Sequence, residues 1–469
     1  MKRGDELELT IENFALEGKC VARHDGFVVF ASGVVPGDIA RLRIEKMRRN
    51  FAEAIPVSIL RPSPYRTTPP CKYFGTCGGC TWQHVQYDSQ LALKRQNVID
   101  AFERIGGFRG IEVAPTLPSE QVFFYRNKIE FSFSRQRWIL QEAVDTEPSL
   151  QNSFALGFHR AGRYDNVLDV DACLLQSEIS NEILLSVKEF CQRRQLQAYD
   201  SENQSGYLRY LVIREGKNTG DLMINLVTFD DRPETASELC AYLVEKFPSV
   251  TTFVNTINPR RAQIAAGEFE RVYYGAGTIM EKIGRYQFRI SASSFFQTNT
   301  KQAEKLFDLV KSLAEFKPTD VVYDLYSGTG ALSIYMSDTV RNVVGIELVS
   351  SSVTDAQHNA SLNGVTNSIF LQGDLRQRLT RDTRWIDEHG SPDVILIDPP
   401  RSGMHPKVIQ RIARLFPPLI VYVSCNPATQ ARDVRSLVDA GYALEHLQPV
   451  DLFPHTFHVE SVAKLVRKS

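Results

Sequence analysis

The sequence predicts a multidomain α/β protein with an N-terminal small β-barrel, a central α+β domain and a C-terminal doubly wound α/β domain. Short strand-like runs punctuated by glycines come first, as in small barrels. A proline-rich linker then leads into three closely spaced cysteines. Apolar runs finally alternate with helix-like segments up to the end of the chain. We place the domains at residues 1–62, 63–290 and 291–469.

The composition is that of an ordinary soluble protein, with 43% hydrophobic and 23% charged residues among 469. No apolar run reaches the roughly 18 residues that span a bilayer, and no apolar signal region follows the first residues. We therefore expect no membrane partner and a cytoplasmic location. Because the net charge is −1, any RNA-binding surface must be local. No repeat or heptad pattern indicates self-association, so we expect a monomer.

The first domain contains four strand-like runs, at residues 7–11, 27–30, 39–44 and 52–59. Short strands with glycine turns indicate a small barrel of the OB type, a frequent nucleic-acid binder. The basic stretch at residues 41–49 could contact RNA phosphates, or it could be one solvated face of a strand.

A cysteine cluster follows the linker, with the spacing C-x5-C-x2-C at Cys71, Cys77 and Cys80. Thiolates this close together are ligands for a soft metal. Structural zinc usually uses paired C-x2-C hooks or histidines, and only one such hook is present. Three close cysteines and one remote cysteine are typical of an iron–sulfur cluster, and Cys173 is the best remote candidate. The sequence thus favours a [4Fe–4S] cluster over zinc.

Residues 87–105 predict one long helix with apolar side chains along one face, which Gly106 and Gly107 end. From residue 123 to about 290, apolar runs bounded by glycines predict mostly strands with some helix. We interpret this central region as an antiparallel α+β domain.

A glycine turn at residues 327–330 begins the nucleotide-binding pattern of the third domain. It follows an apolar run that ends at Asp324, and a second apolar run ends at Glu347, an acid suited to ribose hydroxyls. The turn lacks the third glycine that packs a helix against a dinucleotide pyrophosphate. This favours an adenosine cofactor without pyrophosphate, S-adenosylmethionine (SAM), over NAD.

The rest of the domain continues the alternation of strand and helix. Asn299 is a predicted helix cap, and Gly364 is the predicted stop of a helix that ends at Asn363. Further strands are expected at residues 369–371, 394–397, 419–423, 443–447 and 458–466. This order predicts a mostly parallel sheet.

Two successive strands end in residues suited to pyrimidine chemistry. Asp398-Pro399-Pro400 follows the fourth strand and is typical of methyltransferases that act on nucleobases or amides. Cys425 follows the next strand. A pyrimidine C5 becomes nucleophilic enough to accept a methyl group when a thiolate adds to C6, and a base must then remove the C5 proton. Glu460, at the start of the final strand, could be that base or an ordinary surface carboxylate.

These motifs resemble those of the RNA uracil-C5 methyltransferases. The matching segments, in chain order, are Phe295-Phe296-Gln297-x-Asn299, DLYSGTG, Glu347, Gly373-Asp374, DPPRSG, SCNPATQARD and HTFHVE. The resemblance implies a Rossmann-like SAM-dependent methyltransferase domain and an N-terminal barrel of the TRAM type. It also implies that the helix at 87–105 packs on the catalytic domain, which would make the central domain discontinuous.

The resemblance also implies roles for individual residues. Cys425 would be the nucleophile and Glu460 the base, and the cluster cysteines with Cys173 would match the [4Fe–4S] site of ribosomal-RNA members. The residues expected to line the SAM site are Gln297, Tyr326, Glu347, Asp374 and Asp398. Bacterial tRNA-specific members are expected to lack both the TRAM domain and the cluster, so the resemblance favours 23S rRNA as the RNA partner and 5-methyluridine as the product.

Three other functions stay open at this point. The chain could methylate uridine C5 in tRNA, or it could methylate a base amino group, which also uses Asp-Pro-Pro but needs no cysteine. It could also be an iron–sulfur RNA-binding or assembly factor with an inactive catalytic domain. Together, Asp398, Cys425 and Glu460 favour an active C5 methyltransferase.

Overall fold

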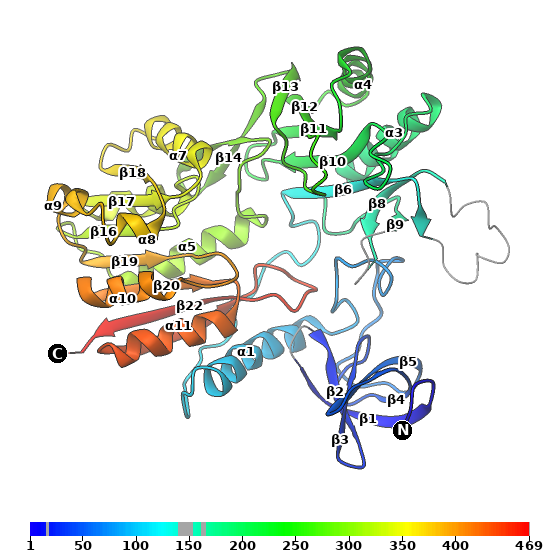
Figure 1. The fold of residues 1–469 in the computed structure, drawn as a ribbon, viewed down its shortest axis with the longest axis horizontal. Coiled ribbons are helices and arrows are strands. Elements are labelled where there is room, and N and C mark those ends of the chain that lie inside the picture. The colour runs from blue at the N-terminus through cyan, green and yellow to red at the C-terminus, as the bar shows by residue number, and fades with distance from the viewer. Residues whose placement is uncertain (16–17, 139–152, 161–165, 469) are drawn as a thin grey trace.

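The computed structural model describes residues 1–15, 18–138, 153–160 and 166–468. A barrel, a central sheet and a C-terminal sheet follow one another along the chain (Figure 1). Across these described ranges, no helix combines the length and apolar character needed to cross a membrane.

The N-terminal barrel is closed, with the strand order β1-β2-β3-β5-β4. Its strands are β1 (Glu6–Phe14), β2 (Cys20–His24), β3 (Phe27–Ala31), β4 (Ile39–Met47) and β5 (Phe51–Arg61). Alternate side chains point inward, so that Ala40, Leu42 and Ile44 of β4 are buried. Strand β2 was not predicted, because only Cys20 and Ala22 of this short strand point into the core.

The central domain contains an eight-stranded sheet with the order β13-β12-β11-β10-β6-β8-β9-β7. Its strands are β6 (Lys128–Ser134), β7 (Arg137–Trp138), β8 (Ala155–His159), β9 (Val167–Asp169), β10 (Leu208–Glu215), β11 (Leu222–Thr228), β12 (Thr252–Ile257) and β13 (Phe269–Tyr274), with helices α3 (Glu178–Arg193) and α4 (Pro233–Lys246).

The prediction of an antiparallel central domain was wrong in part, because the sheet is mixed. β11 and β12 pair in parallel, as do β7 and β9. Helix α4 connects β11 to β12, and a helical crossover returns the chain to the same end of a sheet. A separate hairpin of β14 (Thr278–Ile283) and β15 (Tyr286–Ser291) leads to the C-terminal domain.

The C-terminal sheet has seven strands in the order β18-β17-β16-β19-β20-β22-β21. Their bounds are β16 (Val321–Leu325), β17 (Asn342–Glu347), β18 (Ser368–Gln372), β19 (Val394–Ile397), β20 (Leu419–Ser424), β21 (Tyr442–Val450) and β22 (Glu460–Arg467). The first five run parallel, and β22 lies antiparallel between β20 and β21. The predicted mostly parallel sheet is confirmed. Strand order reverses on the two sides of β16, which is where doubly wound sheets bind ligands.

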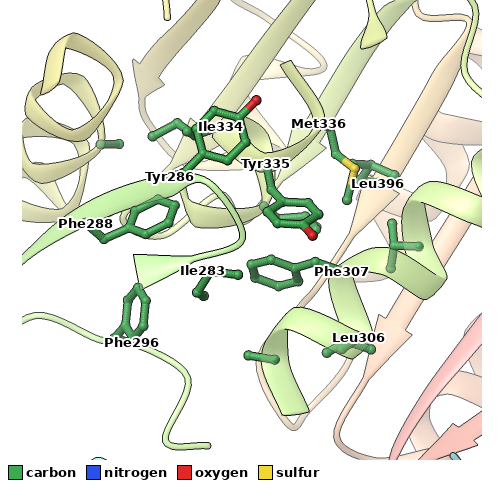
Figure 2. Close-up of a cluster of buried hydrophobic side chains, with 14 of the residues drawn as sticks. Ile283, Tyr286, Phe288, Phe296, Leu306, Phe307, Ile334, Tyr335, Met336 and Leu396 are labelled. Atoms are coloured by element: carbon green, nitrogen blue, oxygen red, sulfur yellow. The ribbon is translucent and has the colours of Figure 1, made fainter. Parts of the chain in front are cut away.

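Both faces of this sheet are covered, because its strands alternate between two apolar cores. Val322 belongs to one core, whereas its neighbours Val321 and Tyr323 belong to the other. The helices of the C-terminal domain are α5 (Thr300–Ala314), α6 (Ala331–Met336), α7 (Ser350–Leu362), α8 (Leu375–Arg378), α9 (Arg384–His389), α10 (Pro406–Leu415) and α11 (Pro427–Asp439). In the first core, Phe307 of α5 and Tyr335 of α6 pack beneath the β14–β15 hairpin (Figure 2).

Helix α1 (Tyr87–Arg104) precedes the central domain in the chain but packs on the C-terminal domain. Its Val98 and Phe102 are fully buried in the second core of the C-terminal sheet. It lies against α11 (Figure 1), and its Leu93 packs against a small apolar cluster that contains Val35 of the barrel domain. The helix thus brings residues from the N-terminal part of the chain close to the end of the chain.

Candidate active site

A cavity of about 760 Å³, here called the strand-end cavity, lies at the carboxyl ends of the parallel strands. Every residue that the sequence predicted for cofactor binding or catalysis lines it: Gln297, Tyr326, Glu347, Asp374, Asp398, Cys425 and Glu460. Parallel strands all end at the same edge of a sheet, so residues far apart in the chain meet there.

The glycine turn after β16 forms the floor of the cavity. Tyr326, Gly328 and Gly330 have left-handed backbone conformations, with φ of 71°, 54° and 78°. A Cβ atom at Gly330 would lie 2.8 Å from the Phe370 ring and 2.9 Å from the Ala356 Cβ, so a larger residue does not fit. The turn therefore packs tightly against Phe370 and Ala356, while its Gly328 lines the cavity.

Glu347, the last residue of β17, is fixed by the glycine turn. Its two carboxylate oxygens accept hydrogen bonds from the backbone N–H of Gly328 at 3.0 Å and of Val349 at 2.8 Å. Asp374 caps α8 and accepts from Arg376, whose guanidinium holds the pKa of Asp374 below its usual range. Both carboxylates are oriented before any ligand arrives, as a ribose or amino group requires.

Two further acids lie deeper in the cavity. Burial raises the pKa of Asp324 to about 6, and Ser333 Oγ donates to its carboxylate at 2.5 Å. Burial, with the Asp324 charge, also raises the pKa of Asp398. Acids that lose water and face like charges hold protons more strongly, so this end of the cavity can retain a proton near neutral pH.

Cys425 and Glu460 are brought together by strand pairing. Ser424 pairs with Ser461 in the antiparallel register of β20 and β22, so the residues next to them share one end of the ladder. Burial raises the pKa of the Cys425 thiol to about 11, and the charges of Glu460 and Asp398 add to the effect. Burial and Asp398 likewise raise the pKa of Glu460, which is 5% exposed. A partly exposed thiol and a buried carboxyl thus lie at the same end of the ladder.

Some lining residues were not singled out from the sequence as site residues. Phe295 is 67% exposed, and Phe453 reaches the cavity from the loop before β22. Arg401 is not among the lining residues, but its positive charge partly offsets the rise in the pKa of Cys425, and its guanidinium is 3.2 Å from His458 Nδ1. The sequence motif Asp-Pro-Pro-Arg could have identified Arg401. No sequence pattern identifies Phe453, because its position at the cavity depends on how its loop folds.

A second cavity of about 440 Å³, here called the cysteine cavity, is lined by all four predicted cluster residues: Cys71, Cys77, Cys80 and Cys173. Gly79 N–H donates to Cys77 Sγ at 3.4 Å. Phe295 and Phe296 line both cavities, so the two adjoin. Among the described residues, no three His, Cys, Asp or Glu side chains are grouped so as to hold a metal ion.

The doubly wound sheet, its tight glycine turn and the acid at the end of β17 define an enzyme of the class that binds an adenosine cofactor at its strand ends. A family model described as tRNA (Uracil-5-)-methyltransferase matches residues 274–468, and a TRAM domain model matches residues 1–57.

Similar proteins extend the match to nearly the whole chain. Proteins described as uncharacterized RNA methyltransferases are 41% identical in Chlorobaculum tepidum, over 98% of this chain and 96% of the relative, and 41% identical in Porphyromonas gingivalis, over 98% and 100%. The crystal structure of Pyrococcus abyssi tRNA (uracil-54, C5)-methyltransferase with S-adenosyl-L-homocysteine is 29% identical, covers 98% of this chain and 100% of that one, and has a TM-score of 0.74.

The chain belongs to the RNA uracil-C5 methyltransferase family and carries an N-terminal TRAM domain. It is a SAM-dependent enzyme that methylates C5 of uracil in RNA. The alternatives of an amino-group methyltransferase and of a factor without enzyme activity are therefore set aside.

Proposed function

We propose that Cys425 is the nucleophile and Glu460 the base of a covalent mechanism. The observation that carries this proposal is the β20–β22 pairing, which places both groups in the strand-end cavity beside Asp398. The target uridine must leave its stack to enter so enclosed a site. Burial raises the pKa of both groups, so the reacting form is the one in which Cys425 is a thiolate and Glu460 a carboxylate, after both protons have passed to solvent.

The reaction then proceeds through atoms that this chain can reach. The Cys425 thiolate forms a bond to C6 of uracil, and the electron pair that moves to C5 forms a bond to the methyl group. Bound SAM would supply that methyl group as an electrophile, with the S–CH3 bond breaking and its electron pair staying on the sulfur of S-adenosyl-L-homocysteine. Glu460 accepts the C5 proton, the C6–sulfur bond breaks, and Cys425 is released as thiolate.

We propose that Gln297, Tyr326, Glu347, Asp374 and Asp398 hold SAM. The carboxylate of Glu347 is already fixed by two backbone N–H groups and suits a ribose diol. The carboxylate of Asp374, which keeps its charge, suits a donor group of the cofactor. Asp398 lies closer to the thiol, where it adds negative charge beside the reacting centre.

We propose further that Cys71, Cys77, Cys80 and Cys173 hold a [4Fe–4S] cluster. The cysteine cavity of about 440 Å³ has room for a cluster of several atoms, and the Gly79 N–H donated to Cys77 suits a cluster-ligating thiolate. Zinc remains the other candidate, and iron and sulfide analysis of anaerobically purified protein decides between them.

For the RNA substrate we propose 23S rRNA, on the presence of the TRAM barrel and the four cysteines. A second candidate is tRNA, because the Pyrococcus abyssi enzyme acts on tRNA and covers 98% of this chain. Such coverage includes the barrel, so the barrel by itself does not separate the two substrates.

Tritium release from RNA labelled at uridine C5 tests the mechanism and the substrate together. Purified enzyme should release tritium with SAM from 23S rRNA and not from tRNA of the same source. Release from tRNA alone would overturn the rRNA proposal and leave the chemistry standing. Methyl incorporation without release from either RNA would overturn the covalent C5 mechanism.

A further inference from the structure

The loop at residues 451–459, here called the base-carrying loop, connects β21 to Glu460 at the start of β22. It has no helix or strand of its own, yet Asp451, Leu452 and Val459 are buried. It also presents Phe453 to the strand-end cavity. Buried irregular backbone needs hydrogen-bond partners from other segments. The groups that hold this loop therefore set the position of Glu460 at the start of β22.

Lys94 of α1 provides the first of these contacts. Its Nζ donates to Asp451 Oδ1 at 2.5 Å and to the Phe453 carbonyl at 2.9 Å, and both charged side chains are 0% exposed. The Tyr87 hydroxyl donates to the other Asp451 oxygen at 2.9 Å. A buried ion pair gains little stability over an apolar pair of the same size, because both charges lose their water. Its geometric effect is to fix the loop on both sides of Leu452.

Gln90, one turn earlier on α1, holds the middle of the loop. Its Oε1 accepts from His455 N–H at 2.9 Å, and its Nε2 lies 3.2 Å from His455 Nδ1. The His455 carbonyl accepts from both Thr81 and Trp82 N–H at 2.9 Å, next to Cys80. His455 has a left-handed backbone with φ of 66°, a conformation that persists only where neighbours hold it.

We propose that Lys94 and Gln90 are positioning residues for the methyl transfer reaction, which set the base-carrying loop so that Phe453 and Glu460 face the flipped uridine. They act through the loop and touch neither substrate nor cofactor. The inference rests on the proposed role of Glu460 as the base. It explains why a helix from the N-terminal part of the chain packs against the catalytic sheet.

Lys94→Met and Gln90→Leu test the proposal. Moving the loop should slow removal of the C5 proton more than thiolate addition, so the covalent protein–RNA adduct should accumulate on denaturing gels. We expect kcat to fall on the order of 10²-fold, as for a small misplacement of a catalytic group. The KM for RNA and the SAM dissociation constant should each stay within about twofold of their wild-type values. Unchanged kcat, or loss of SAM binding without adduct, would overturn the proposal.

Two controls separate positioning from folding. Lys94→Met with Asp451→Asn removes the buried charge left by the single change but still leaves the Phe453 carbonyl without its donor. Positioning predicts that this double variant folds and still accumulates adduct, whereas full activity would show that the pair serves stability alone. Gln96→Leu, at an exposed site on the same helix, should behave as wild type.

Glu460→Gln separates this inference from the function on which it rests. If that variant traps adduct and the α1 variants do not, positioning by α1 is wrong and the base assignment stands. If Glu460→Gln turns over normally, the base assignment itself is wrong.

Discussion

The strand-end cavity and the cysteine cavity adjoin each other but are built in different ways. The strand-end cavity collects charged groups at the edge of one sheet, and the packed glycine turn and strand pairing set their positions. The cysteine cavity is lined by thiols from two loops that lie about a hundred residues apart in the chain. The first lies at the ends of regular strands, whereas the second lies between loops that Tyr73 and Asp171 join by hydrogen bonds.

The two cavities therefore have different proposed roles: the first holds the groups proposed to react, and the second holds the cysteines proposed to bind a cluster. In the strand-end cavity, burial raises the pKa of Asp398, Cys425 and Glu460, so protons are stored where the proposed reaction moves them. The cysteine cavity is lined by apolar side chains such as Phe158 and also by charged ones such as Arg126. Changes in one cavity should therefore alter catalysis, and changes in the other should alter metal content first.

Cys425→Ala should have the largest effect. Loss of the proposed nucleophile should lower methyl transfer by on the order of 10⁴-fold or more, because Cys425 is the one thiol among the described residues that line this cavity. SAM affinity, measured by calorimetry, should be unchanged within about twofold, since the thiol is not placed among the cofactor contacts. A large loss of SAM binding would contradict this division of roles.

Glu460→Gln should come next. The glutamine keeps the shape of the side chain but cannot accept the C5 proton, so the protein–RNA adduct should persist after denaturation while tritium release stops. Cys425→Ala with Glu460→Gln is the matched control and should form no adduct. Normal turnover of the single variant would assign the base to another carboxyl, with Asp398 as the nearest.

Cys173→Ser tests the cysteine cavity. Replacing one of the four proposed thiolate ligands should lower iron content and visible absorbance several-fold, while SAM affinity stays within about twofold of wild type. Cys240→Ala is the control, because Cys240 lies on the buried face of α4 in an apolar core, and its replacement should leave iron content unchanged. Equal iron loss in both variants would mean that the core, and not ligation, holds the cluster.

The smallest effect should be a pH dependence of stability. The pKa of Glu460 is raised in the folded protein, so the group binds its proton more tightly when folded than when unfolded. Its contribution is therefore present below the unfolded pKa and is lost as pH rises through the folded pKa. Glu460→Gln should be more stable than wild type at pH 9 relative to pH 5, by on the order of 1–3 kcal/mol. Parallel stability curves in thermal unfolding would contradict this.

Much of the C-terminal domain was predictable because its rules are local. The expected strand at residues 394–397 is β19, the helix expected at 87–105 is α1, and Asn299 caps α5 through Gln302 N–H. Parallel strands converge at one edge, so the strand pattern alone was enough to place the residues that follow them in one cavity. The mixed pairing of the central sheet was missed, because the alternation of side chains along a strand does not specify which strand pairs with it. Strand β2 was missed because it is short and buries few side chains.

The amino-acid sequence alone established which residues could carry the chemistry: a thiol and an acid at strand ends, a glycine turn for the cofactor, and four cysteines spaced for a cluster. Tertiary packing set what holds them in place. Lys94 and Asp451 are 357 positions apart, and nothing in the pattern of either segment marks them as partners. Local patterns report on turns, caps and faces, but a buried contact between distant segments forms only when the whole chain packs and water is excluded from both groups.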